Sequence, residues 1–177
     1  MLNVKTMDNS WRPGVISTMS KTNSMRFLEL KVPPPVVALS IAGLSWIASW
    51  AAPTLGFVLP HRNVIVLALL VAGVCVALLG VASFRRARTT VNPLKPEKSS
   101  ALVMSGIYQY TRNPMYLGLL LVLLGWVLFV SNIIAFVLLP VFILYLNRFQ
   151  IGPEERTLAS MFGQEFTAYK AKVRRWI

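Results

Sequence analysis

Two short stretches hold most of the residues whose side chains could do chemistry. The first, "GIYQYTRNPMYLG" at 106–118, places three tyrosines, an arginine and an Asn-Pro pair at the start of a long apolar run. The second, "GPEERTL" at 152–158, puts Glu154 and Glu155 just beyond that run. An arginine beside a helix N-terminus suits a carboxylate or phosphate. The acids suit an ammonium or a sugar hydroxyl, and the tyrosine rings suit a flat base or a cation.

The small number of histidines and cysteines argues against a zinc site and against a cysteine nucleophile. His61 is the only histidine, and Cys75, the only cysteine, lies inside an apolar run. A zinc site needs clustered ligands, and a cysteine nucleophile needs a base beside it. We therefore expect no metal site and no disulfide, which suits a protein that faces the cytosol.

Composition indicates the class of protein. Hydrophobic residues make up 55% of the 177, above the share of an ordinary soluble domain. The formal net charge of +12 would suit nucleic acid, but the basic residues flank apolar runs instead of forming a separate domain. The sequence predicts an integral membrane protein in contact with a lipid bilayer, with no nucleic-acid partner.

Apolar runs of spanning length recur along the chain, and a spanning helix needs roughly 17–25 residues. Ser131-Asn132 divides the last run, so its two helices should form a hairpin. We expect an all-α, polytopic membrane helix bundle with spans at about 34–52, 63–84, 114–130 and 133–151. Glycines at seven-residue spacing in the middle two spans favour close helix contact. They are Gly73, Gly80, Gly118 and Gly125.

Lys and Arg are distributed unevenly about these spans. They precede the first span, fill the loop at 85–113 and follow the fourth span, whereas only Arg62 lies between the first and second. By the positive-inside rule, both termini, the loop and the site face the cytosol.

The segments outside the spans differ in character. Residues 1–24 are polar and lack an apolar signal region, so we expect a disordered arm before a single domain at 25–177. The segment 153–177 should form amphipathic helices broken near Gly163, with Pro153 in the first turn. Its apolar stripe predicts an interfacial anchor. The stripe comprises Leu158, Phe162, Phe166, Tyr169, Val173 and Trp176. For the third span, Pro114 should be the first helical residue, with the Asn113 side chain accepting a backbone N–H as the cap.

Together the two opening stretches resemble a known superfamily of membrane enzymes, the isoprenylcysteine carboxyl methyltransferases and phospholipid methyltransferases. The shared pattern is G-x-Y…R-[HN]-P-x-Y-x-G, then a helical hairpin, then E-E-x-x-L…F-G-x-x-[YF]-x-x-Y…V-x-R-[WF]. The likeness covers about 26–177. It implies an S-adenosylmethionine cofactor held by the loop at 85–113, the last two helices and the tail.

The resemblance also implies the site residues. Cofactor contacts are expected from Leu102, Val103, Gly106, Tyr108, Arg112, Asn113, Pro114, Tyr116, Leu117, Gly118, Glu154 and Glu155. Catalytic roles are expected for Arg112, Tyr116 and Glu155, and Glu155 is expected to contact the cofactor more closely than Glu154. Asn113 stands where the eukaryotic enzymes have histidine, and an amide can donate a hydrogen bond but cannot titrate.

Methyl transfer from a sulfonium is an in-line displacement that needs alignment and exclusion of water. The expected acceptor is amphiphilic: an isoprenoid-linked thiol or carboxylate, or a phospholipid amine. An amine must lose a proton, and Glu155 or Tyr116 would be the nearest bases. Two alternatives stay open, an NADPH-dependent membrane sterol or enone reductase and a non-catalytic membrane scaffold.

Overall fold

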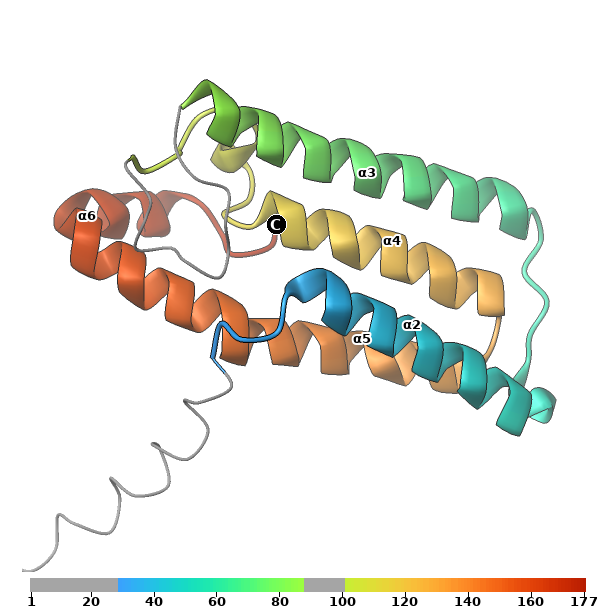
Figure 1. Cartoon of the computed structure of the whole chain (residues 1–177). Helices are drawn as coiled ribbons and strands as arrows, with labels where there is room; N and C mark the ends of the chain where they lie inside the picture. The colour runs from blue at the N-terminus through green and yellow to red at the C-terminus, as the bar shows by residue number, and fades with distance from the viewer. Residues whose placement is uncertain (1–28, 88–100) are drawn as a thin grey trace, which may run out of the picture.

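The computed structural model describes residues 29–87 and 101–177, and these form a bundle of helices (Figure 1). Its elements are α2 (Pro34–Ala51), η2 (Pro53–Leu55), α3 (Arg62–Arg86), η4 (Gly106–Gln109), α4 (Pro114–Val130), α5 (Ile133–Leu146), η5 (Asn147–Ile151) and α6 (Gly152–Lys172). Within the described ranges the only β pairing is an isolated bridge between Gly56 and Asn132. The predicted all-α class is confirmed. The predicted arm at 1–24 and residues 88–100 of the predicted loop at 85–113 lie outside the described residues.

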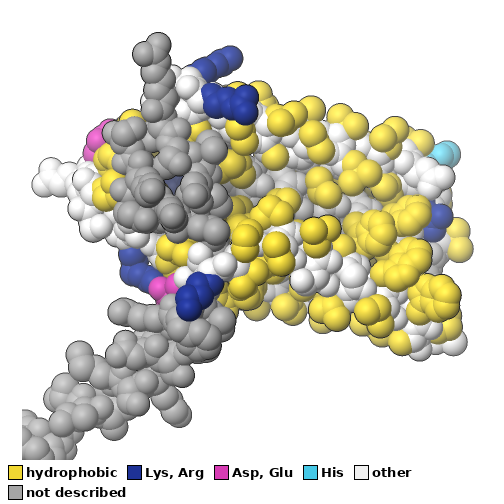
Figure 2. Space-filling view, in the orientation of Figure 1, with side chains coloured by type: hydrophobic (Ala, Val, Ile, Leu, Met, Phe, Trp, Pro, Cys, Tyr) yellow, Lys and Arg dark blue, Asp and Glu magenta, His cyan; other side chains and the backbone are white. Residues whose placement is uncertain are grey.

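The helices suit a membrane. Helices α2 and α3 and the continuous helix Ile133–Lys172 are long and apolar enough to cross one, and α4 is a shorter apolar helix of 17 residues. Hydrophobic side chains cover the length of the bundle, and charged side chains gather mainly at one end (Figure 2). Large side chains such as Leu39 and Trp50 are 72% and 77% exposed. Such an apolar surface is costly in water but suits lipid, so the protein is an integral membrane protein.

The closest packing in the bundle lies between α3 and α4. A Cβ atom added to Gly118 would lie 2.5 Å from the carbonyl oxygen of Gly73, and one added to Gly73 would lie 2.7 Å from the carbonyl oxygen of Gly118. Gly80 and Gly125 also face the opposite helix. The predicted glycine contact is confirmed, because the two backbones approach to a distance that only glycine permits.

The predicted hairpin continues into one long helix. Ile133–Lys172 has 40 residues, more than the roughly 20 that a hydrocarbon core requires. Its apolar part, α5 with the π-helical turn η5, matches the fourth predicted span. The polar helix α6 lies beyond the span and has the predicted break at Gly163, where φ is 49° and ψ is −118°.

Helix α4 occupies the centre, with α3 on one side and α2 and α5 on the other. Buried side chains from α2, α4, α5 and η5 form the main core, namely Ile41, Tyr116, Leu123, Phe142, Leu146 and Ile151. This packing brings the start of α4, the start of α6 and the C-terminal tail to the same end of the bundle (Figure 1). We call it the site end.

The opposite end, here called the turn end, is closed by hydrogen bonds in which no carboxylate takes part. Asn132 is 1% exposed, and its Nδ2 donates to the carbonyl oxygen of Ala52 at 2.8 Å. The Oδ1 of Asn132 accepts from the N–H of Ile134 at 2.9 Å and so caps α5. Arg62 donates to Ser131 Oγ at 3.3 Å. These contacts fix the segment after α2 onto the turn between α4 and α5.

Candidate functional site

The two stretches singled out in the sequence meet at the site end. Arg112, just before α4, donates from Nη2 to Oε1 of Glu155 on α6 at 3.0 Å. Both side chains are largely buried, with 9% and 12% of their surface exposed. The hairpin thus brings the acids of the second stretch to the arginine of the first.

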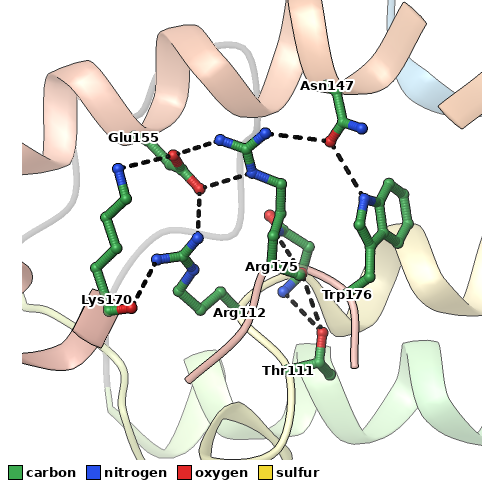
Figure 3. A network of polar contacts seen from close by, with 8 residues as sticks. Thr111, Arg112, Asn147, Glu155, Lys170, Arg175 and Trp176 are labelled. Atoms are coloured by element: carbon green, nitrogen blue, oxygen red, sulfur yellow. Dashed lines mark hydrogen bonds and ion pairs between the residues drawn. The ribbon is translucent and has the colours of Figure 1, made fainter. Parts of the chain in front are cut away.

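Glu155 lies at the centre of a cluster of positive charges (Figure 3). Arg175 donates to both of its oxygens, from Nε at 3.0 Å and from Nη2 at 2.7 Å, and Lys170 Nζ lies 3.5 Å from Oε2. Burial alone would raise the pKa of the Glu155 carboxyl. The hydrogen bonds from Arg175 and the charges of Arg112 and Lys170 outweigh burial and hold that pKa below its ordinary value.

Glu154, the adjacent acid, lies in a different environment. Its Oε1 accepts hydrogen bonds from the Tyr116 hydroxyl and, at 2.9 Å, from Gln150 Nε2. Burial raises the pKa of Glu154 to about 7, although these two hydrogen bonds oppose the shift. Successive helical residues point about 100° apart, so Glu155 reaches the positive charges while Glu154 points into the protein.

Tyr108 forms a further wall of this region. It is 5% exposed, packs edge-on against Phe84 at 5.4 Å between ring centroids, and its carbonyl oxygen accepts from the Tyr169 hydroxyl at 2.7 Å. Burial raises the pKa of the Tyr108 hydroxyl, which therefore stays protonated. Gly106 begins η4 with φ at +64°, a conformation that favours glycine. Tyr110 is 76% exposed and stands apart from the buried acids.

The prediction for the Asn113 side chain is wrong. Asn113 is the residue before α4 and Pro114 is in the first turn, as expected, but the Asn113 side chain makes no cap hydrogen bond. Its Nδ2 instead donates to the carbonyl oxygen of Arg175 at 2.8 Å. The Asn113 side chain therefore ties the tail to the start of α4.

The other predicted residues are divided between two surroundings. Pro114 and Gly118 face α3, since each lies within contact distance of a Cβ built on the facing glycine of that helix. Leu102 packs against the cluster of Phe166, Tyr169 and Val173, and Val103 is 6% exposed. Leu117 is half-buried on α4, with its N–H bonded to the carbonyl oxygen of Asn113.

The expected interfacial anchor is also corrected. Phe166, Tyr169 and Val173 are 3%, 7% and 8% exposed and pack with Leu102, Leu158 and Phe162 in a second core. Trp176 packs on the main core and donates from Nε1 to Asn147 Oδ1 at 3.2 Å. The stripe holds the tail against the protein because the kink at Gly163 turns the chain back.

The predicted site residues did not include Asn147, Gln150, Lys170 or Arg175. Asn147 and Gln150 lie on η5, and a π-helical turn has no clear sequence signature. From the sequence, the basic residues of the tail are expected only to set the orientation in the membrane by the positive-inside rule. The motif V-x-R-[WF] was the available signal for Arg175.

The charges at the site end are unbalanced. The positive side chains of Arg112, Lys170 and Arg175 surround the single carboxylate of Glu155, which leaves the cluster about two charges positive. Arg112 Nε is buried and has no hydrogen-bond partner among the described residues. An unpaired buried donor is costly, so this N–H suits an acceptor supplied by an anionic ligand. The described residues contain no group of three or more His, Cys, Asp or Glu side chains able to hold a metal ion.

Comparison with known proteins identifies the family. Residues 61–165, more than half of the chain, match the family described as phospholipid methyltransferase. The chain therefore belongs to the phospholipid methyltransferase family and is a membrane methyltransferase.

Curated relatives agree with this assignment. The chain is similar to the "Protein-S-isoprenylcysteine O-methyltransferase" of Schizosaccharomyces pombe, with 33% identity over 79 residues, 45% of this chain and 34% of that protein. The Saccharomyces cerevisiae protein of the same name is 35% identical over 82 residues, 45% of this chain and 33% of that protein. The chain thus spans about a third of the length of each yeast enzyme. An "Uncharacterized protein" of Haemophilus influenzae is 52% identical over 63 residues, 36% of this chain and 100% of that protein.

Proposed function

We propose that the methyl donor is S-adenosylmethionine and that it binds at the site end. The observation that carries this proposal is the buried Arg112 Nε, which has no acceptor among the described residues and lies beside the positively charged cluster around Glu155. The donor carries a carboxylate, which suits this N–H, and an ammonium group, which suits a carboxylate oxygen. Its sulfonium supplies an electrophilic methyl group.

The two adjacent acids have different roles in this proposal. Glu155 is already paired with Arg112, Lys170 and Arg175, so we assign it to holding the cluster together. Both described hydrogen bonds to Glu154 end on Oε1, which leaves Oε2 to accept from a ligand. We therefore propose Glu154, and not Glu155 as expected from the sequence, as the main acidic contact of the donor.

The acceptor is proposed to be amphiphilic, either an isoprenoid-linked thiol or carboxylate or a phospholipid amine. Thiolate and carboxylate acceptors need no base, whereas an amine must lose a proton before or during attack. In this proposal both oxygens of Glu154 are engaged, Oε1 by Tyr116 and Gln150 and Oε2 by the donor, so the site suits an acceptor that needs no base. The surrounding tyrosines and the tail would exclude water from the reacting groups.

We further propose that the site end faces the cytosol. Arg85 and Arg86 end α3 there, near the ion cluster of Arg112 and Arg175, whereas Arg62 lies at the turn end. This asymmetry supports the positive-inside orientation. Reporter fusions at Pro60 and at Ile177 should report opposite sides of the membrane, and the same side for both would contradict it.

A nicotinamide dinucleotide is the second candidate ligand, because the positively charged cluster also suits a phosphate. Thermal-shift titrations of detergent-purified protein with S-adenosylhomocysteine and with NADPH distinguish the two. A ligand at about 100 times its dissociation constant stabilises a protein by about 2.7 kcal/mol. We expect a shift with S-adenosylhomocysteine, and no shift with NADPH.

A matched pair of variants localises the effect. Glu154→Gln should weaken S-adenosylhomocysteine binding by about 1.5–3 kcal/mol, the value of a hydrogen bond to a charged group. Glu165→Gln makes the same change at an exposed position of α6 and should leave binding unchanged. Stabilisation by NADPH alone would support the reductase alternative, and no shift with either ligand would favour the scaffold.

A further inference from the structure

The C-terminal tail, residues 173–177, follows α6 without regular secondary structure and is nevertheless tied to the site. Chain ends are usually loosely ordered unless they dock on the protein. Here the N–H of Arg112 donates to the carbonyl oxygen of Arg174 at 3.0 Å, and Asn113 Nδ2 donates to that of Arg175 at 2.8 Å. Val173 is 8% exposed in the second core. The tail is therefore a fixed wall beside the start of α4 (Figure 1).

The Arg175 side chain is oriented from two sides. Its Nε and Nη2 form a two-point pair with both oxygens of Glu155, and its Nη1 donates to Asn147 Oδ1 at 3.4 Å. Figure 3 shows Arg175 between Glu155 on α6 and Asn147 on η5. Only the planar guanidinium can make this two-point pair, and lysine cannot.

This pairing decides how Arg112 can approach the same carboxylate. Arg175 engages both oxygens of Glu155, whereas Arg112 reaches that carboxylate with one nitrogen, Nη2. The Nη1 of Arg112 donates to the carbonyl oxygen of Lys170 at 3.4 Å, and its Nε has no hydrogen-bond partner among the described residues. An arginine that is alone with a carboxylate favours two parallel hydrogen bonds. Without the Arg175 fork, Arg112 could give up its long bond to the Lys170 carbonyl oxygen, turn, and donate from Nε to Glu155.

We propose that Arg175 is a positioning residue that keeps Arg112 Nε available for an acidic group of the ligand. Arg175 acts through Glu155 and does not itself need to touch the ligand. The inference rests on the proposed function, because the carboxylate of the methyl donor is the acidic group expected there.

The test compares neighbouring arginines in the full-length, detergent-purified protein. Arg175→Lys keeps the charge and removes the fork, so we expect the dissociation constant of S-adenosylhomocysteine to rise about tenfold. Arg174→Lys changes an exposed side chain of the same tail and should leave that constant within about twofold of the wild-type value. An Arg175→Lys affinity equal to the wild-type affinity would overturn the proposal.

A second ligand separates positioning from a general structural role. Methylthioadenosine shares the nucleoside of S-adenosylhomocysteine but lacks its amino-acid part, both the carboxylate and the ammonium group. Its affinity should therefore be the same in the wild type and in Arg175→Lys. Equal weakening of both ligands would mean that the variant merely disturbs the fold, which contradicts the proposal.

The failure of the proposed function would look different. In that case the wild type would bind neither nucleoside ligand, and NADPH, through its phosphates, becomes the anionic probe for the same pair of variants. If NADPH does not bind either, the inference can still be tested without a ligand. The melting temperatures of Arg112→Lys, Arg175→Lys and the double variant then form a double-mutant cycle. Shared use of Glu155 predicts non-additive losses, and additive losses would overturn the inference.

Discussion

The site end and the turn end close the same bundle with different chemistry. At the turn end, Asn132 and Ser131 make neutral hydrogen bonds and Arg62 adds one bond to a hydroxyl. At the site end, Arg112 and Arg175 converge on Glu155, and the buried Nε of Arg112 has no hydrogen-bond partner in the part of the chain that the structure describes. Among the described residues, the buried polar side-chain atoms of the turn end all have hydrogen-bond partners, whereas the site end has a buried donor that could still bind an acceptor.

This difference separates stability from function. A satisfied buried amide contributes to holding helices in place, and its loss should reduce stability wherever it lies. An unsatisfied donor and a surplus of positive charge are costly unless a ligand completes them. We therefore expect changes at the turn end to act on the free energy of unfolding, and changes at the site end to act on ligand affinity.

The seam between α3 and α4 joins the two ends, so breaking it should have the largest effect. In Gly118→Ala the new Cβ would lie 2.5 Å from the Gly73 carbonyl oxygen and 2.8 Å from Ala77 Cβ. We expect a loss of about 3 kcal/mol or more in stability, measured by thermal unfolding in detergent. Gly43→Ala on α2 meets no atom within 4 Å and should be neutral or slightly stabilising. Equal melting temperatures for the two variants would contradict the close packing.

Removal of the main contact of the turn end should have the next largest effect. Asn132→Ala leaves the Ala52 carbonyl oxygen and the first turn of α5 without their partners, which should cost about 1–3 kcal/mol of stability. Asn63→Ala, at an exposed position in the first turn of α3, is the control. Affinity for S-adenosylhomocysteine should be unchanged in both variants. A weaker affinity in Asn132→Ala would show that the two ends are coupled.

The pH dependence should be smaller and should carry the signature of Glu154. The folded state raises its pKa to about 7, so it holds a proton that the unfolded chain releases near the ordinary carboxyl pKa. Stability should therefore fall by on the order of a few degrees in melting temperature as the pH rises from about 5 to above 7. Glu155, whose pKa is lowered, loses its contribution only in more acidic solution.

Ligand affinity should show the opposite trend over the same range. An ammonium group requires the ionised Glu154 carboxylate, so S-adenosylhomocysteine should bind more tightly as the pH rises through about 7. Glu154→Gln should flatten both curves. A Glu154→Gln variant with the wild-type pH dependence would assign the titration to another group.

The helices of this protein could be predicted from its sequence more completely than the contacts within the site. The apolar runs, the glycine spacing and the hairpin predicted the helices, the seam and the meeting of Arg112 with Glu155, because each depends on local pattern. The environments of Glu154 and Glu155 depend on where the tail goes after the kink at Gly163. A sequence marks such a kink through its glycine, but the direction of the chain beyond it depends on tertiary packing.

The contacts of Asn147 were also difficult to predict from the sequence, because this residue lies on the π-helical turn η5. An extra residue in one helical turn rotates every later side chain, and only packing decides whether it forms. Asn147, on this turn, reaches Arg175 and Trp176 of the tail, a contact that was not predictable from spacing along a regular helix. Gln150 and Glu154, in contrast, lie four residues apart, which is an ordinary helical spacing.

The most direct test compares one arginine from each end of the bundle. Isothermal titration with S-adenosylhomocysteine should be carried out on the wild type, Arg112→Lys and Arg62→Lys, since both variants keep the charge and remove guanidinium donors. We predict a dissociation constant at least about tenfold higher for Arg112→Lys, from the lost charge-assisted hydrogen bonds, and no change for Arg62→Lys. Wild-type affinity in Arg112→Lys, or an equal loss in both variants, would contradict a donor site built around Arg112.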